Sequence, residues 1–84
     1  MRSVVYSKQA LKALRAMPTN TAKLIVSKVT QYAAEPTAQA NNVTALKGQP
    51  GHHRLRVGDW RVIFSDDGEV IAIIKIAPRG AAYD

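Results

Sequence analysis

The sequence contains no cysteine, which excludes disulfide bonds, thiolate nucleophiles and cysteine-ligated metal sites. No segment approaches the roughly 18 consecutive apolar residues of a membrane-spanning helix. The first residues, MRSVVYSKQA, also lack the apolar run of a secretory signal. We therefore expect a cytoplasmic protein that makes no membrane contact.

Acidic residues are scarce, and they are unevenly placed. The chain has 12 Lys and Arg against 6 Asp and Glu, which gives a formal net charge of +6. Glu35 is the single acid among the first 51 residues, which hold seven basic residues, whereas from His52 onward five basic residues accompany five acids. The excess charge favours an acidic partner such as nucleic acid, anionic lipid or an acidic protein segment. The arginines of the second part must act through their positions, because that part is nearly neutral.

The 84 residues are enough for one domain, and no repeat or linker divides residues 1–84. The β-branched and aromatic run over residues 2–6 predicts a first strand, and Ser7 after it is a good helix N-cap. A first helix is expected to end before Pro18, because proline interrupts helices.

A second helix is predicted to begin near Thr19 or Asn20 and to end before Pro36. Apolar residues at three- and four-residue spacing indicate that the two helices form a hairpin with one apolar side. This spacing assigns to that side Ala10, Leu11, Leu14, Met17, Leu24, Ile25, Val29 and Tyr32.

Residues 37–53 are rich in Asn, Gly and small polar residues, which predicts a connection with Val43 and Leu46 as its core anchors. The apolar period then changes from about 3.6 to about 2. Two turn signals, GD and DG, divide residues 53–76 into a three-stranded antiparallel meander. The predicted fold class is α+β in the order β-α-α-β-β-β, with the helices packed on one face of the sheet.

Three arginines lie within HRLRVGDWRVIF, which otherwise reads as a sheet hairpin. A two-residue turn at GD places Arg56 opposite Arg61, and opposed residues share a face of the sheet. Arg54, Arg56 and Arg61 then lie together on one face. The other face, which we expect to form the floor for the helices, receives Leu55, Val57, Trp60, Val62 and Phe64.

Like charges in directly opposed positions repel, so Arg56 and Arg61 are expected to need an anion such as phosphate or carboxylate. The alternative is a solvated face on which arginine serves solubility. Such faces usually mix Lys, Glu, Thr and Ser, whereas this face uses the side chain suited to bidentate contact with phosphate. Arg79 and Tyr83 follow the last strand, and a tyrosine near a basic face can stack on a base. Tyr83 can equally pack against the core or fray.

The order of these segments resembles the RelE/ParE superfamily of bacterial toxins from type II toxin-antitoxin systems. The similarity covers nearly the whole chain, and its most specific parts are LKG, the RLRVGDWRVIF hairpin and the closing PRGAAY. RelE-like members are ribosome-dependent endoribonucleases that cut mRNA in the ribosomal A site. ParE-like members inhibit DNA gyrase and lack the ribonuclease residues. This chain looks more like the first kind.

The resemblance implies five catalytic positions, which match Arg54, Arg56, Arg61, Arg79 and Tyr83. The implied reaction transfers the phosphodiester to the neighbouring 2′-hydroxyl and leaves a 2′,3′-cyclic phosphate and a free 5′-hydroxyl. Arg61 is expected to stabilise the negative charge of the transition state, with support from Arg54 and Arg56. Arg79 would neutralise or protonate the leaving oxygen, and Tyr83 would stack on or orient the base. No cofactor or metal is implied.

The best-known RelE pattern has lysines at the positions of Arg54 and Arg56. Lysine becomes a general base more readily than arginine, so the resemblance does not identify the base here. An imidazole is suited to moving protons at neutral pH. His53 is expected on the face of Leu55, away from the arginines, and His52 in a loop. Adjacent histidines without a carboxylate are not a zinc pattern.

The resemblance also implies a cognate antitoxin that covers or distorts the basic site, in a toxin-antitoxin hetero-oligomer. A net charge of +6 fits an acidic antitoxin. Three functions stay open: an endoribonuclease that acts on mRNA on the ribosome and inhibits translation, a ParE-like gyrase inhibitor that is not an enzyme, and a plain nucleic-acid-binding module. The full set of site residues favours the first over the second and does not separate the first from the third.

Overall fold

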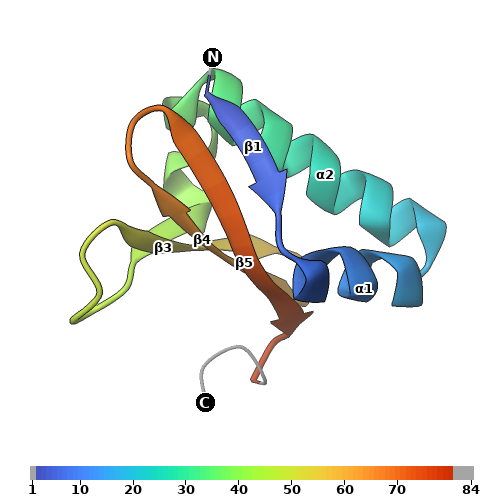
Figure 1. Cartoon of the computed structure of the whole chain (residues 1–84). Coiled ribbons are helices and arrows are strands. Elements are labelled where there is room, and N and C mark those ends of the chain that lie inside the picture. The colour runs from blue at the N-terminus through green and yellow to red at the C-terminus, as the bar shows by residue number, and fades with distance from the viewer. Residues whose placement is uncertain (1, 81–84) are drawn as a thin grey trace.

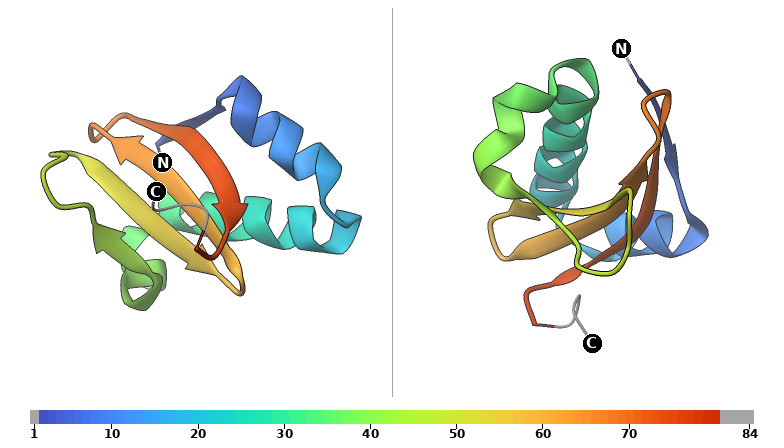
Figure 2. Two further views of the ribbon diagram at one scale, coloured as in Figure 1. Left: turned by 90° about the horizontal axis from the view of Figure 1, so that it is seen from below. Right: turned by 90° about the vertical axis from the view of Figure 1, so that its left-hand side faces the viewer.

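The computed structural model describes residues 2–80. A five-stranded sheet carries two helices, and α2 crosses one face of the sheet while α1 lies beside β1 and β5 (Figure 1; Figure 2). The strand order is β1-β5-β4-β3-β2, with β1 parallel to β5 and the other pairs antiparallel. The predicted α+β class is confirmed. In chain order the elements are β1 (Ser3–Tyr6), α1 (Lys8–Ala16), α2 (Thr19–Ala34), the 3-10 helix η1 (Pro36–Asn42), β2 (Val43–Ala45), β3 (His52–Val57), β4 (Trp60–Asp66) and β5 (Val70–Pro78).

The segment predicted as a plain connection contains two elements, η1 and β2. Val43 pairs with Leu55 and Thr44 with Arg54, so β2 forms the edge of the sheet next to β3. Three residues are too few to show an alternating pattern, and the preceding asparagines favour turns over strands. Val43 packs against the core, as predicted.

Ser7 begins α1 as the sequence predicts. Its hydroxyl accepts a hydrogen bond from the backbone N–H of Ala10 at 3.0 Å and donates to the carbonyl of Ile74 at 2.7 Å. The cap therefore also ties α1 to β5. Helix α2 begins at Thr19, as the sequence predicts, and Pro18 is its N-cap. Proline suits this end of a helix because the first backbone N–H groups need no partner within the helix.

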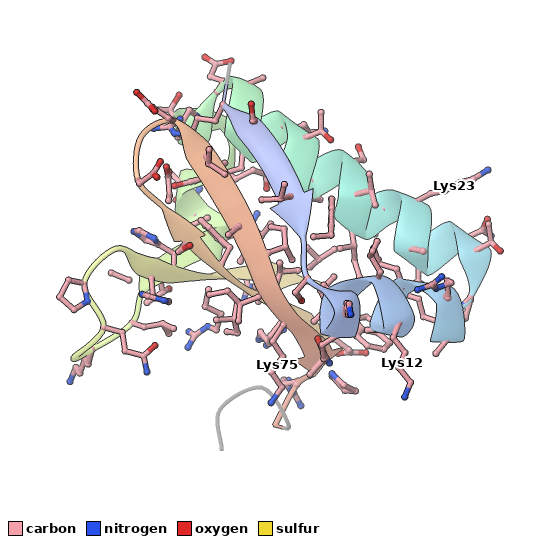
Figure 3. All side chains as sticks on the ribbon, in the orientation of Figure 1. Lys12, Lys23 and Lys75 are labelled. Carbon is pink, nitrogen blue, oxygen red and sulfur yellow. The ribbon has the colours of Figure 1, made fainter. Side chains whose placement is uncertain are left out.

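Two leucines predicted for the core are exposed instead: Leu11 by 42% and Leu24 by 47%. The apolar stripe of α2 is rotated from the predicted one, because Ala22 packs against the core and Ala33 is buried in it. Small residues allow close approach of the helix to the sheet, and periodicity gives them little weight. Lys12 and Lys23 extend from the outer surfaces of the helices (Figure 3).

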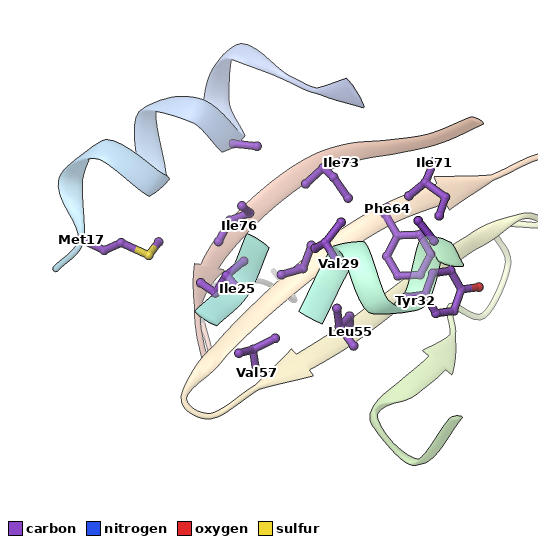
Figure 4. Close-up of a cluster of buried hydrophobic side chains, with 13 residues drawn as sticks. Met17, Ile25, Val29, Tyr32, Leu55, Val57, Phe64, Ile71, Ile73 and Ile76 are labelled. Atoms are coloured by element: carbon purple, nitrogen blue, oxygen red, sulfur yellow. The ribbon is translucent and has the colours of Figure 1, made fainter. Parts of the chain in front are cut away.

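The core lies between the helices and the sheet (Figure 4). Phe64 is 1% exposed, with its ring centroid 5.0 Å from that of Tyr32 and 5.4 Å from that of His53. The predicted floor is confirmed, with Trp60 only partly buried. Both helices contribute to the same cluster, whose buried members are Ala10, Met17, Ile25, Val29, Tyr32, Ala33, Leu55, Val57, Val62, Phe64, Ile71, Ile73 and Ile76.

A carboxylate near the loop between β4 and β5 connects three parts of the chain. Asp66 lies 3.0 Å from the Arg2 guanidinium, accepts from the Tyr32 hydroxyl at 3.1 Å, and accepts from the Gly68 N–H at 2.9 Å. Burial raises the pKa of Tyr32, and the hydrogen bond to Asp66 raises it further. Asp67 accepts from two further backbone N–H groups of this loop, and these bonds lower the pKa of Asp67. The loop is therefore held mainly by side-chain oxygens.

Candidate active site on the outer face of the sheet

The β3–β4 hairpin has the register that a two-residue turn predicts. Arg56 pairs with Arg61 and Arg54 with Ile63, so the three arginines share the face of the sheet opposite the core. Gly58 has φ +58° while Asp59 has a negative φ, as in a type II′ turn. A pocket of about 170 Å³ lies on this face, lined by Asn41, Asn42, Thr44, Arg54, Arg56 and Arg61.

Arg61 is only 9% exposed, and backbone carbonyls hold its guanidinium. Its Nη1 donates to the carbonyl oxygens of Gly58 and Trp60, each at 3.0 Å. Gly58 and Trp60 belong to the hairpin turn directly before Arg61, so the turn fixes the orientation of the Arg61 side chain. A buried, doubly anchored guanidinium loses little freedom when an anion binds, which is the preorganisation that transition-state stabilisation needs.

Arg56 is exposed, and its Nη2 donates to Oδ1 of Asn42 at 3.4 Å. The two opposed arginines thus have separate partners, because Arg61 bonds to the turn and Arg56 to the end of η1. Among the described residues, the pocket lining holds neutral amides, a hydroxyl and arginines, and no carboxylate. The described lining side chains are therefore neutral or positively charged, which suits an anionic ligand.

The two other predicted catalytic residues are not part of this lining. The backbone N–H of Arg79 donates to the carbonyl of Asp59 at 2.7 Å, which places Arg79 beside the hairpin turn with an exposed side chain. Tyr83 lies outside the described residues. Lys75 pairs with Ile63 and therefore shares the outer face with Arg54, near the end of β5 (Figure 3).

Neither histidine lines the pocket. His52 is the first residue of β3 and not part of a loop, and its Nδ1 lies 3.2 Å from the carbonyl oxygen of Pro50. It is on the outer face, but four residues along the strand separate it from Arg56, a distance of about 13 Å. His53 lies on the core side of the sheet, as predicted, and its ring stacks on that of Phe64. The described lining therefore contains no imidazole that could act as a base.

The sequence did not identify three members of the lining, Asn41, Asn42 and Thr44. They reach the site because β2 pairs with β3 and places Thr44 beside Arg54. The only available signal was the polar NNVT run before the hairpin, and asparagines in a connection ordinarily indicate a turn.

A second, larger concavity lies between the two helices. It has a volume of about 490 Å³, an apolar floor and a rim that includes Arg15 and Lys23. The floor is formed by Leu14, Met17, Ala22 and Val26. Across residues 2–80, no three His, Cys, Asp or Glu side chains gather as a metal site would require. Within the same residues, neither helix combines the length and the apolar character needed to cross a membrane.

Comparison with known proteins gives consistent matches over almost the whole chain. Residues 4–83 match the family described as the ParE toxin of type II toxin-antitoxin system, parDE. The structure is similar to a chain of the archaeal RelE-RelB complex from Pyrococcus horikoshii OT3, with 32% sequence identity, a TM-score of 0.79, and coverage of 94% of this chain and 96% of that chain. No curated protein sequence matches.

More distant structures share the fold. A chain of the intact E. coli RelBE toxin-antitoxin complex is 18% identical with a TM-score of 0.74, covering 93% of this chain and 96% of that chain. A chain of the E. coli DinJ-YafQ complex is 16% identical with a TM-score of 0.67, covering 100% of both chains.

Proposed function

Because the chain belongs to the ParE toxin family of type II toxin-antitoxin systems, within the RelE/ParE superfamily, we propose that this toxin is an endoribonuclease. Its proposed substrate is mRNA in the ribosomal A site, and its proposed effect is inhibition of translation. The observation that carries the proposal is the pocket on the outer face, where three arginines meet without a carboxylate among the described lining residues. The 32% identity to a chain of a RelE-RelB complex supports the RelE-like branch.

The proposed reaction is attack of a 2′-hydroxyl on the adjacent phosphodiester. The new bond joins the 2′-oxygen to phosphorus, the bond to the 5′-oxygen breaks, and that oxygen leaves with a proton as a free 5′-hydroxyl. The proposed role of Arg61 is to stabilise the charge on the non-bridging oxygens. This role is supported by the two bonds from Nη1 to the turn, which hold the guanidinium in place and leave its other N–H groups for a phosphate. Arg54 and Arg56 add charge from the neighbouring strand.

The remaining steps involve groups outside this lining. A guanidinium is not deprotonated in proteins, so the 2′-hydroxyl proton must leave to a group that the described lining does not contain. Arg79, beside the hairpin turn, is the proposed partner of the leaving oxygen. Tyr83 is the proposed stacking partner of a base. Base stacking on an aromatic ring contributes about 1–3 kcal/mol in single-stranded complexes.

Expression in a growing bacterium tests the proposal, with mRNA 5′ ends mapped at translated codons. The wild-type chain should stop growth and produce new 5′ ends, whereas Arg61→Ala should do neither. Lys8→Ala is the matched control, since it removes an exposed basic residue from α1 and leaves the pocket intact. Growth arrest that survives Arg61→Ala would contradict the role of Arg61.

One observation favours a second candidate, inhibition of DNA gyrase, because the matching family is described by its ParE members. The same experiment separates the two functions. DNA damage or gyrase arrest with unchanged mRNA would exclude the nuclease. Binding of ribosomes and RNA without new 5′ ends would instead indicate a nucleic-acid-binding module.

We also propose a cognate antitoxin as the partner, in a hetero-oligomer like the RelE-RelB complex from Pyrococcus horikoshii OT3. The groove between α1 and α2 suits an amphipathic antitoxin segment. Apolar side chains of such a segment would cover Met17 and Val26, and its carboxylates would meet Arg15 and Lys23. Neither helix contains an acid that would oppose this arrangement, and opposite charges would steer the encounter.

A further inference from the structure

Three amide side chains connect α2 to the arginine pocket. Gln39 in η1 is 3% exposed, and its Nε2 donates to Oε1 of Gln31 on α2. Its Oε1 accepts from Nδ2 of Asn42 at 3.2 Å, and Oδ1 of Asn42 accepts from Nη2 of Arg56 at 3.4 Å. Asn42 and Gln39 therefore each accept through the oxygen and donate through the nitrogen, and Gln31 accepts at the end of a chain that runs in one direction from Arg56.

This direction determines which atom Asn42 presents to the pocket. An amide has a donating and an accepting end, and a rotation by half a turn exchanges them. The Gln39 nitrogen points to Gln31, and its oxygen is the atom that faces Asn42. The Asn42 nitrogen must then face Gln39, and its oxygen faces the guanidinium of Arg56. A rotated Asn42 would present N–H groups to a cation and push Arg56 away.

Arg56 needs such an acceptor because it is exposed and directly opposes Arg61. Repulsion and side-chain entropy both favour conformations in which Arg56 leaves the pocket. A neutral acceptor opposes this without cancelling the charge. A carboxylate at the same position would hold Arg56 more tightly, but it would neutralise it and compete with a phosphate.

We propose that Asn42 is a positioning residue that keeps the Arg56 guanidinium at the pocket and apart from Arg61, and that Gln39 sets the orientation of Asn42. This inference rests on the proposed nuclease function for its effect on rate. The predicted effect of Asn42 and Gln39 on the conformational order of the Arg56 side chain does not depend on catalytic activity.

The first test is single-turnover cleavage of mRNA on purified ribosomes by the toxin freed of antitoxin. Asn42→Ala should slow cleavage by about 5- to 20-fold with unchanged ribosome affinity, since a misplaced group loses rate more than binding. Asn20→Ala is the matched control, because Asn20 is an exposed asparagine of α2 outside the pocket, and the rate should stay within about twofold of wild type, as for ordinary surface substitutions. Asn42→Asp should slow cleavage at least as much as Asn42→Ala, although it strengthens the contact with Arg56.

A double-mutant cycle distinguishes positioning from direct contact with RNA. If Asn42 acts through Arg56, Asn42→Ala should have no further effect in the Arg56→Ala background. Equal rates for Asn42→Ala and Asn20→Ala would overturn the proposal, and so would independent, multiplicative effects of Asn42→Ala and Arg56→Ala.

The second test measures the order of the Arg56 side chain by NMR relaxation of its Nε–H group. Asn42→Ala and Gln39→Met should each lower this order, whereas Asn20→Ala should not. Gln39→Met keeps the length of a buried side chain and removes both of its hydrogen bonds. If wild-type toxin cleaves no mRNA, the proposed function fails while this measurement still decides the positioning of Arg56. Unchanged order in both variants would overturn the inference.

Discussion

Replacing Arg61 with lysine would keep the charge of the candidate site and remove its geometry. In the structure, Nη1 satisfies the carbonyls of Gly58 and Trp60 at 3.0 Å each, and the rest of the planar guanidinium remains available. Lysine offers one nitrogen, so an ammonium that reaches the turn carbonyls is withdrawn from a phosphate in the pocket. In Arg61→Lys, binding to the turn carbonyls and binding to a phosphate therefore compete for the single side-chain nitrogen.

The expected magnitudes separate stability from activity. Lysine can keep one of the two bonds to the turn, so the net loss is that of one hydrogen bond to a charged group, about 1.5–3 kcal/mol. Partial exposure of the turn lets water replace the lost donor and brings the cost toward about 1.5 kcal/mol. At about 4–8 °C per kcal/mol, the melting temperature should fall by about 6–12 °C. Loss of a preorganised donor from a developing oxyanion costs about 2.7–4 kcal/mol, or about 100- to 1,000-fold in rate.

Thermal unfolding followed by circular dichroism and single-turnover cleavage on ribosomes measure the two effects. Arg61→Lys should remain folded and cleave at least about 100-fold more slowly than wild type. Arg54→Lys is the matched control, because Arg54 opposes Ile63 and no like charge. It should retain most of the activity. If Arg61→Lys and Arg54→Lys cleave equally well, charge alone suffices and the geometric reasoning is wrong.

Three further substitutions test other parts of the structure. Asp67→Ala should lower the melting temperature near neutral pH, because it removes a carboxylate that accepts two backbone hydrogen bonds. These bonds lower the pKa of Asp67 in the folded state. The stabilisation is therefore present above the ordinary pKa of about 4 and is lost as the pH falls through the pKa of the folded state. A wild-type advantage that persists undiminished at about pH 2 would contradict this. Tyr32→Phe should lower the free energy of unfolding by about 1 kcal/mol in urea, because Asp66 loses a donor, and an unchanged value would show that water replaces it. Val26→Glu should weaken binding of the cognate antitoxin in a co-purification assay, since it places a carboxylate on the groove floor, and undiminished binding would place the antitoxin elsewhere.

The sequence alone was sufficient for the parts of the fold that depend on neighbouring residues. A glycine at a two-residue turn and strict alternation along two strands predicted that Arg56 opposes Arg61, and the structure has this register. Ser7 capped the first helix for the same reason, because an N-cap needs only an oxygen and a nearby backbone N–H. In both places the geometry arises within a few residues, so periodicity and residue type determine it.

Only the tertiary structure decided what surrounds the arginines. The wall containing Asn42 and Thr44 depends on η1 and on a three-residue strand that pairs with the edge of β3. Arg56 and Arg61 have the same chemistry and opposed positions, yet one guanidinium bonds to the turn and the other to η1. Acceptors brought in by the packing of distant segments determine these directions. The sequence therefore determined which residues share the face, and long-range packing determined where their charges point.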